Sequence, residues 1–206
     1  MSTKRKIEDY DKVLAVEGYS DLLFYAEALE FLEKDEDVYI KDFNGASDLL
    51  VKLEVFLDPG LLASKSSIGV ILDADTNPHG RIASLTNLMA RIAQRQMEHG
   101  VWSDGQPKLG FLVVPDSESE GEIETLVWNA WKNDPSNQTS EKCIEDYLAC
   151  MANAGHQATS PDKGRISTLL AVINDEDPRL GPGARANAFP FDRDEFKPLL
   201  AFLDQL

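Results

Sequence analysis

Residues 68–81 read I-G-V-I-L-D-A-D-T-N-P-H-G-R, a run from which the rest of the fold can be worked out. The continuous apolar segment up to Leu72 is typical of a strand buried on both faces of a parallel sheet. Asp73 and Asp75 follow directly, and Asn77-Pro78 then ends the strand. In a strand that continues through Asp75, both carboxylates point to the same face. They repel each other there unless a cation lies between them or both point into water.

The segments on either side of this strand alternate between strand and helix patterns. Short apolar runs predict further strands at 12–17, 38–43 and 108–115. Apolar residues at three- and four-residue steps predict helices at 20–33, 46–57 and 79–98. Ser20 is the expected N-cap of the first helix, and Asp58-Pro59-Gly60 is expected to end the second. The alternation predicts an α/β fold, a mostly parallel four-stranded sheet flanked by helices.

The last third of the chain has a different pattern. Residues 131–206 are expected to form a helical C-terminal extension that packs on the α/β domain of residues 1–130. Helices are predicted at 143–151, 162–173 and 195–206, and a Gly/Pro-rich loop at 180–190 leads into the last of them.

Charge and composition restrict the classes of function. The chain has 206 residues and a net charge of −16, which argues against a protein that simply coats nucleic acid. No apolar run approaches the ~20 residues of a membrane span, and no secretory signal is recognisable. Cys143 and Cys150 match no metal-binding spacing and are expected to be reduced thiols. Together these features predict a cytoplasmic protein with no membrane partner.

Acidic residues follow two of the predicted strands. Glu17 ends the first strand, and Asp73 and Asp75 end the third. Ligands of open α/β sheets bind at the carboxyl ends of the strands, so neighbouring strands would bring these acids to one rim. Carboxylate oxygens suit Mg²⁺ or Mn²⁺. The alternative is that each acid belongs to a solvated turn.

Two motifs resemble those of a known family. V-E-G-Y-S-D at 16–21 and V-I-L-D-A-D-T at 70–76 resemble the signature motifs of the Toprim domain, which occurs in topoisomerases, bacterial primases and OLD-type nucleases. The resemblance covers residues 12–130 and implies that Glu17, Asp73 and Asp75 bind Mg²⁺ for phosphodiester chemistry. It also implies that Glu17 is catalytic. Asp21 matches an additional acid of the OLD-type branch.

The later part of the chain is similar to small single-domain Toprim-like proteins of bacteria and archaea. The similarity rests on P-D-S-E-S-E-G-E-I-E-T-L-V, which contains Glu124, and on Lys163 before a helix; it implies a catalytic role for Lys163. Many Toprim proteins have a third acid where this chain has Asn77, and Glu122 or Glu124 could supply the missing ligand. Arg81 could hold a phosphate, although a surface salt bridge explains it equally well.

Two functional hypotheses follow. The first is a Mg²⁺-dependent nuclease that acts on DNA or RNA in repair or phage defence. The second is a non-catalytic Toprim scaffold, or a module that binds a nucleotide or a protein partner. The charge of −16 favours the second hypothesis, or a small substrate, over tight binding to long DNA. A strip of basic residues beside the acids would favour the nuclease.

Overall fold

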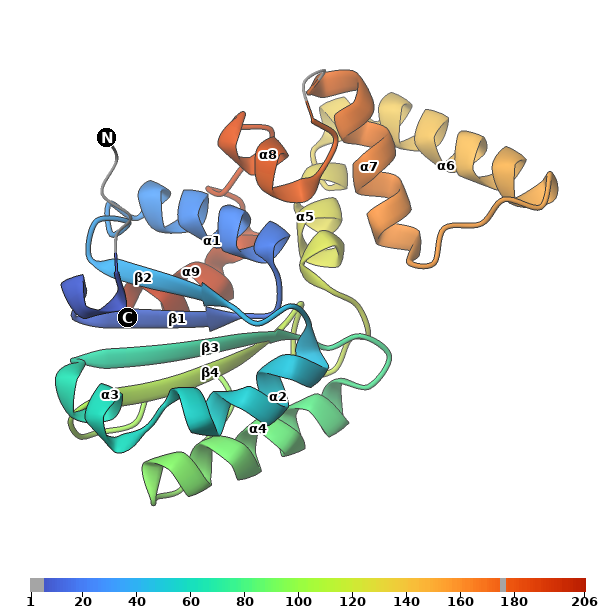
Figure 1. Cartoon of the computed structure of the whole chain (residues 1–206). Helices are drawn as coiled ribbons and strands as arrows, with labels where there is room; N and C mark the ends of the chain where they lie inside the picture. The colour runs from blue at the N-terminus through green and yellow to red at the C-terminus, as the bar shows by residue number, and fades with distance from the viewer. Residues whose placement is uncertain (1–5, 175–176) are drawn as a thin grey trace.

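A computed structural model describes residues 6–174 and 177–206 and contains one parallel sheet (Figure 1). Its strand order is β2-β1-β3-β4, and every neighbouring pair is parallel. The predicted α/β fold with a four-stranded sheet is therefore confirmed. The strands are β1 (Lys12–Val16), β2 (Val38–Asp42), β3 (Ser67–Asp73) and β4 (Lys108–Val114).

The two central strands, β1 and β3, contain continuous apolar runs because both faces of the sheet are covered. β1 pairs with β3 in a register that sets Val13 opposite Ile68, and β3 pairs along its whole length with β4. Helices cover both faces, so the central side chains are buried whichever way they point. Because the strands are parallel, the carboxyl ends of β1 and β3 lie at the same edge of the sheet.

The helices form two layers with a projecting hairpin (Figure 1). One apolar cluster joins α2 and α4 to one face of the sheet, and a second joins α1, α5 and α9 to the other. The hairpin of α6 and α7 extends beyond the sheet. The helices are α1 (Tyr19–Phe31), α2 (Ala46–Phe56), α3 (Pro59–Ser64), α4 (Pro78–Ala93), α5 (Ile123–Lys132), α6 (Gln138–Asn153), α7 (Pro161–Ile173), α8 (Leu180–Arg185) and α9 (Lys197–Asp204). Single 3₁₀ turns occur at Ile7–Asp9, Pro135–Asn137 and Asp194–Phe196.

Two short helices replace predicted loops. The backbone N–H groups of Gly60 and Leu61 donate to Asp58 Oδ1 at 2.7 and 3.0 Å, so Asp58 and Pro59 begin α3 as well as following α2. α8 forms within the predicted Gly/Pro-rich loop and packs on α1. A Cβ on Gly181 would lie 2.5 Å from Cβ of Leu23, so only glycine permits this close packing.

The helix predicted at 79–98 is shorter than expected. α4 ends at Ala93 because Gln94 adopts a left-handed conformation with φ of +53°. The chain then returns to β4 through a segment that contains Trp102, whose Nε1–H donates to the carbonyl of Phe202 at 3.1 Å. Within the residues that the structure describes, no helix has the length and apolar character needed to cross a bilayer.

Candidate metal centre

The acids that end β1 and β3 lie together at the carboxyl edge of the sheet. The backbone N–H of Asp73 donates to Oε1 of Glu17 at 2.7 Å. The carbonyl of Glu17 accepts from the N–H groups of Phe43 and Gly45, which fixes the end of β1 against the loop after β2. The expected meeting of Glu17 and Asp73 at one rim therefore follows directly from the pairing of β1 with β3.

Asp75 does not share a strand face with Asp73, and the expectation that it would is wrong. β3 ends at Asp73, and Asp75 has a left-handed φ of +50°. Its backbone exchanges two hydrogen bonds of 2.7 Å with Gly121, which ties the turn after β3 to the loop after β4. Its carboxylate pairs with Arg81 in the first turn of α4. Arg81 therefore takes part in a salt bridge, the alternative considered for it above.

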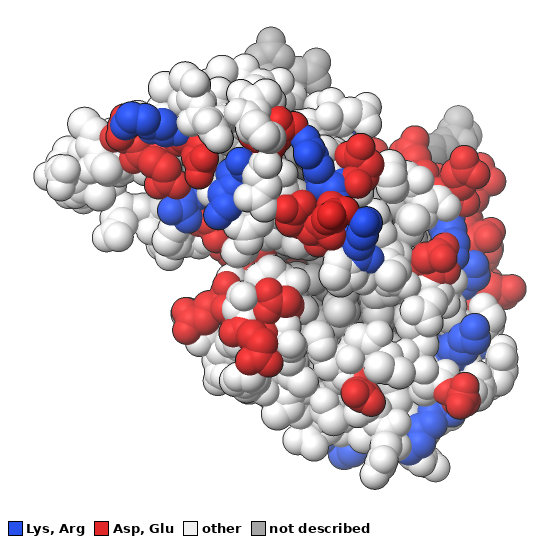
Figure 2. Space-filling model, turned by 180° about the vertical axis from the view of Figure 1, so that it is seen from behind, with Lys and Arg blue, Asp and Glu red and all other residues white. Residues whose placement is uncertain are grey.

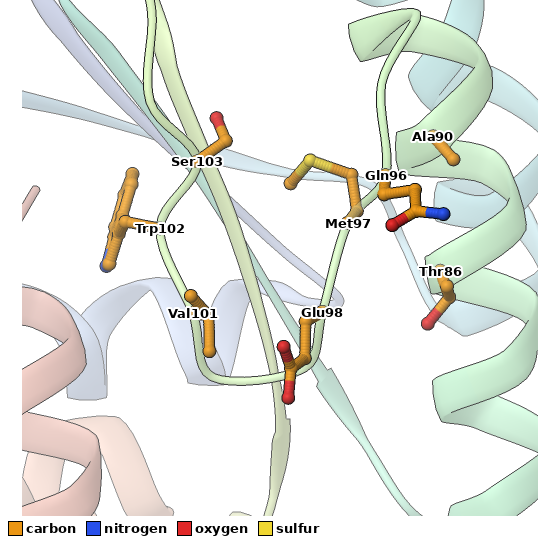
Figure 3. Close-up of a pocket in the computed structure, with 8 residues that line it drawn as sticks. All are labelled: Thr86, Ala90, Gln96, Met97, Glu98, Val101, Trp102 and Ser103. Atoms are coloured by element: carbon orange, nitrogen blue, oxygen red, sulfur yellow. The ribbon is translucent and has the colours of Figure 1, made fainter.

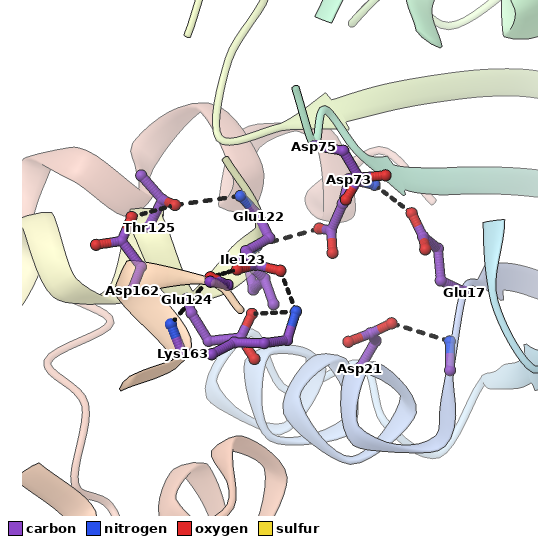
Figure 4. Close-up of polar contacts among 12 residues, drawn as sticks. Glu17, Asp21, Asp73, Asp75, Glu122, Ile123, Glu124, Thr125, Asp162 and Lys163 are labelled. Atoms are coloured by element: carbon purple, nitrogen blue, oxygen red, sulfur yellow. Dashed lines mark hydrogen bonds and ion pairs between the residues drawn. The ribbon is translucent and has the colours of Figure 1, made fainter. Parts of the chain in front are cut away.

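Three carboxylates form a compact group that we call the carboxylate triad: Asp73, Glu122 and Glu124. One oxygen of each lies within 4.8 Å of the others. The loop after β4 brings the two glutamates to Asp73, because the N–H of Ile123 donates to Asp73 Oδ1 at 3.1 Å (Figure 4). Gly121 permits this approach, since its φ of +135° is a conformation that side chains disfavour.

Lys163 reaches the triad from α7. Its ammonium donates to Oε2 of Glu122 and lies 3.7 Å from Oε2 of Glu124. Ser160 caps α7 by accepting from the N–H of Lys163 at 3.3 Å, and its hydroxyl donates to the other oxygen of Glu122. The N-terminal turn of α7 therefore presents a cation and a hydroxyl to one carboxylate.

Glu124 contains the most unusual atom of the site. The residue is only 8% exposed, and its Oε2 has no hydrogen-bond partner within residues 6–174 and 177–206. Buried carboxylate oxygens normally accept hydrogen bonds, because a bare one loses its hydration without compensation. This oxygen lies 3.7 Å from the Lys163 ammonium, an ion pair without a hydrogen bond, and close to two further carboxylates, so it can accept a cation.

Asp21 lies near the triad but has a structural role of its own. The N–H of Gly18 donates to Asp21 Oδ2 at 2.9 Å, and α1 begins at Tyr19. Gly18 is therefore the N-cap, and the prediction of Ser20 was wrong because Asp21 bonds back to the chain from the first turn. Figure 4 shows the Asp21 carboxylate on the side of α1 that faces Glu17 and Asp73.

The clustered acids hold protons more tightly than usual. Burial, together with the charges of Asp21 and Asp75, raises the pKa of Glu17 to about 7, although the hydrogen bond from Asp73 opposes the shift. Burial and the charge of Glu122 raise the pKa of Glu124 to about 7, against the opposing effect of Lys163. Burial and the neighbouring carboxylates also raise the pKa of Asp73. These groups disfavour full ionisation in the absence of a cation.

The stability of the metal-free protein is expected to fall as the pH rises from about 5 to 8. A carboxyl group whose folded pKa is above its unfolded value binds more protons when folded, so ionisation between the two values favours unfolding. For Glu124 the pKa rises from 4.5 in the unfolded chain to about 7 in the folded one, and ionisation across this range lowers the free energy of unfolding by roughly 3 kcal/mol. Urea unfolding at both pH values measures it. Between these pH values the free energy of unfolding of Glu124→Gln should fall by roughly 3 kcal/mol less than that of wild type. An identical pH dependence in the two proteins would contradict the raised pKa of Glu124.

A polar cavity lies beside the triad. Its volume is about 330 Å³, and it is lined by the turns after β3 and β4 and by the start of α7. A larger hollow of about 510 Å³ lies away from the acids, between α4 and the segment before β4 (Figure 3). Its lining contains one carboxylate and no Lys or Arg: Thr86, Ala90, Gln96, Met97, Glu98, Val101, Trp102 and Ser103. Neither lining contains Lys or Arg, but the polar cavity includes Glu122 of the triad and is therefore the better candidate for a substrate.

The structure sorts the predicted site residues into groups. Asp73 and Glu124 meet in the triad, with Lys163 in contact, whereas Glu17 and Asp21 lie beside it. The main addition is Glu122, considered above only as an alternative ligand, which belongs to the triad together with Glu124. Ser160 was missed, although Ser-Pro before an acidic residue is a typical helix start and could have placed Lys163 in the first turn of α7.

Comparison with known proteins gives one family match. A family described as "Protein of unknown function (DUF3226)" matches residues 11–206 of the chain. No curated protein and no solved structure matches the chain. The match spans the sheet, the triad and the C-terminal helices, so all the elements that build the site lie within the family region.

Proposed function

We propose that this chain, which belongs to the DUF3226 family, is a divalent-cation-dependent enzyme that hydrolyses phosphodiesters. The observation that carries the proposal is the buried Glu124 oxygen without a hydrogen-bond partner, within 4.8 Å of oxygens of Asp73 and Glu122. The resemblance of residues 16–21 and 70–76 to Toprim motifs supports the same chemistry. A nuclease acting on DNA or RNA in repair or phage defence, and therefore in the cytoplasm, is the specific form that we propose.

The residues of the triad fit a hard divalent cation. Mg²⁺ and Mn²⁺ take carboxylate oxygens and retain several waters, and the triad offers three carboxylates next to a polar cavity. When bound, such an ion would polarise a phosphoryl oxygen and make a water molecule more acidic. Asp73, Glu122 and Glu124 would hold the ion.

Other residues at the rim have separate roles in this proposal. Glu17, with a pKa of about 7, is suited to exchange a proton at neutral pH. Lys163 and Arg81 are the cations nearest the acids in the ion pairs described above, and either could orient a phosphate group. Asp21 holds the start of α1, from which it faces Glu17 and Asp73.

A second candidate function is a module that binds a nucleotide or a protein without catalysis. The surface charge favours it, because in Figure 2 Lys and Arg side chains are scattered among acidic ones. On that face of the described chain no continuous basic strip runs beside the hollow below the projecting helices. Binding to a long duplex needs such a strip, so the nuclease we propose is expected to act on short single-stranded ends of DNA or RNA rather than on long duplexes.

Metal binding and hydrolysis test the proposal together. Calorimetric titration with Mn²⁺ should show binding to wild type and a loss of affinity of about tenfold or more in Glu124→Gln, because the variant replaces a charged oxygen that has no hydrogen-bond partner among the described residues. Glu118→Gln is the control, since Glu118 is exposed, lies outside the triad and pairs with His79 at 3.6 Å. Hydrolysis of bis(p-nitrophenyl) phosphate and of single- and double-stranded DNA and RNA should require the metal. Metal binding without hydrolysis of any substrate would favour the non-catalytic module.

A further inference from the structure

The ammonium of Lys163 lies where a cation bound by the triad would contact two of its ligands. It donates to Glu122 Oε2 and lies 3.7 Å from Glu124 Oε2, and these two residues are two of the three members of the triad (Figure 4). Both glutamates are buried, so little water compensates their charge. Among the described residues, Lys163 therefore supplies the positive charge that contacts the triad.

An ammonium and a divalent cation cannot share these oxygens without cost. At short range two positive charges repel strongly, and the repulsion is larger in a partly buried site than in water. A divalent cation held by the triad would have twice the charge of the ammonium, which contacts one oxygen closely and a second at 3.7 Å. Metal binding at the triad therefore favours departure of the ammonium.

We propose that Lys163 is an internal counter-ion of the triad that a bound divalent cation displaces, freeing the amine to contact the phosphate of the substrate. The inference rests on the proposed metal site and adds an exchange of cations within it. A lysine suits this role because its charge is at the end of a flexible four-carbon chain. The side chain of Lys163 is 50% exposed, so it can turn from the glutamates toward the cavity without being drawn out of the core.

The helix that carries Lys163 is held in place while its side chain changes partner. The hydroxyl of Thr125 in α5 donates to Asp162 at 2.6 Å, and Asp162 also pairs with Arg165 at 2.6 Å. Arg165 in turn pairs with Glu145 of α6 at 2.7 Å. Ile166, Leu169 and Leu170 bury the inner face of α7. The displacement is therefore a movement of one side chain, with the α6–α7 hairpin fixed.

The accessibility of the amine provides the test. Purified full-length protein is treated briefly with an amine-acylating ester at fixed pH, with and without saturating Mg²⁺, and labelling at each lysine is measured by mass spectrometry. An amine released from an ion pair reacts faster, so labelling of Lys163 should rise several-fold with Mg²⁺. Lys142, in an exposed ion pair with Asp146 at 2.7 Å on α6, is the internal control and should not change.

A Mn²⁺ titration separates this inference from the metal site itself. Lys163→Met keeps the length and apolar stem of the side chain and removes the competing charge, so it should bind Mn²⁺ several-fold more tightly than wild type. Lys142→Met should bind it as wild type does. Absence of Mn²⁺ binding in every variant would overturn the metal site and the inference together. Binding with unchanged Lys163 labelling, or with weaker affinity in Lys163→Met, would overturn the displacement alone.

Discussion

Asp73→Asn is expected to abolish metal-dependent hydrolysis and to lower the affinity for Mn²⁺ by about 100-fold or more. Asp73 is the triad member that the sheet itself positions, since it is the last residue of β3. Loss of a partner outside the ligand shell already costs about 10- to 100-fold in affinity, and loss of a charged ligand should cost at least as much. Asparagine keeps an oxygen that can accept from the N–H of Ile123, so the fold should survive.

The same substitution should stabilise the protein without metal. Burial and the charges of Glu17, Asp21 and Glu124 raise the pKa of Asp73, so its ionised form is unfavourable in the folded state. A neutral amide removes that repulsion, and each kcal/mol gained would raise the Tm by about 2–4 °C for a chain of this size. Metal should raise the Tm of wild type by ligand linkage and leave that of the variant unchanged.

Asp75→Asn is the matched control for Asp73→Asn. Asp75 is exposed, lies outside the triad and pairs with Arg81, so its loss should change Mn²⁺ affinity much less. Thermal melts and calorimetric titrations of both variants make the comparison. Equal losses of affinity in the two variants would mean that the metal lies between Asp73 and Asp75, as a continued strand would have placed it. No loss in either would place the metal elsewhere.

The contrast between Asp73 and Asp75 shows which features of the site can be predicted from the sequence and which cannot. Continuous apolar runs predict buried parallel strands, and the acids after them are then predicted to lie at the carboxyl edge. Whether the second acid remains in the strand depends on its backbone conformation. Asp75 leaves the strand because its backbone bonds to Gly121, 46 positions further along the chain, and no local pattern reveals that pairing.

The partners of Asp73 were harder to predict for the same reason. Glu122 and Glu124 lie at the start of α5, after an acid-rich loop in which several acids are equally plausible ligands, and the bond from Ile123 to Asp73 brings these two to the site. Lys163 reaches Glu122 across 41 positions of sequence through the docking of α7 on α5. Family resemblance suggested a role for Lys163, but its contact with the glutamates depends on tertiary packing.

Glu17→Gln is expected to lower the rate of hydrolysis by about 10²- to 10⁴-fold while metal binding is retained. Glu17 lies outside the triad, so a neutral side chain there removes no ligand from the group that would hold the ion. Its carboxyl group has a pKa of about 7, and glutamine cannot take up or release a proton in that range. Glutamine can still accept from the N–H of Asp73 through its oxygen, so the rim should keep its geometry.

Kinetics and metal titration together determine the role of Glu17. Asp21→Asn is the control, because Asp21 faces Glu17 and asparagine can still accept from the N–H of Gly18; it should reduce the rate far less. If Glu17 transfers a proton, Glu17→Gln should lower kcat with Mn²⁺ affinity near that of wild type. A parallel loss of affinity would make Glu17 a metal ligand, and the site would then extend from the triad to the end of β1. Hydrolysis at the wild-type rate would place proton transfer on another group, and the raised pKa of Glu17 would reflect only its burial among the other carboxylates.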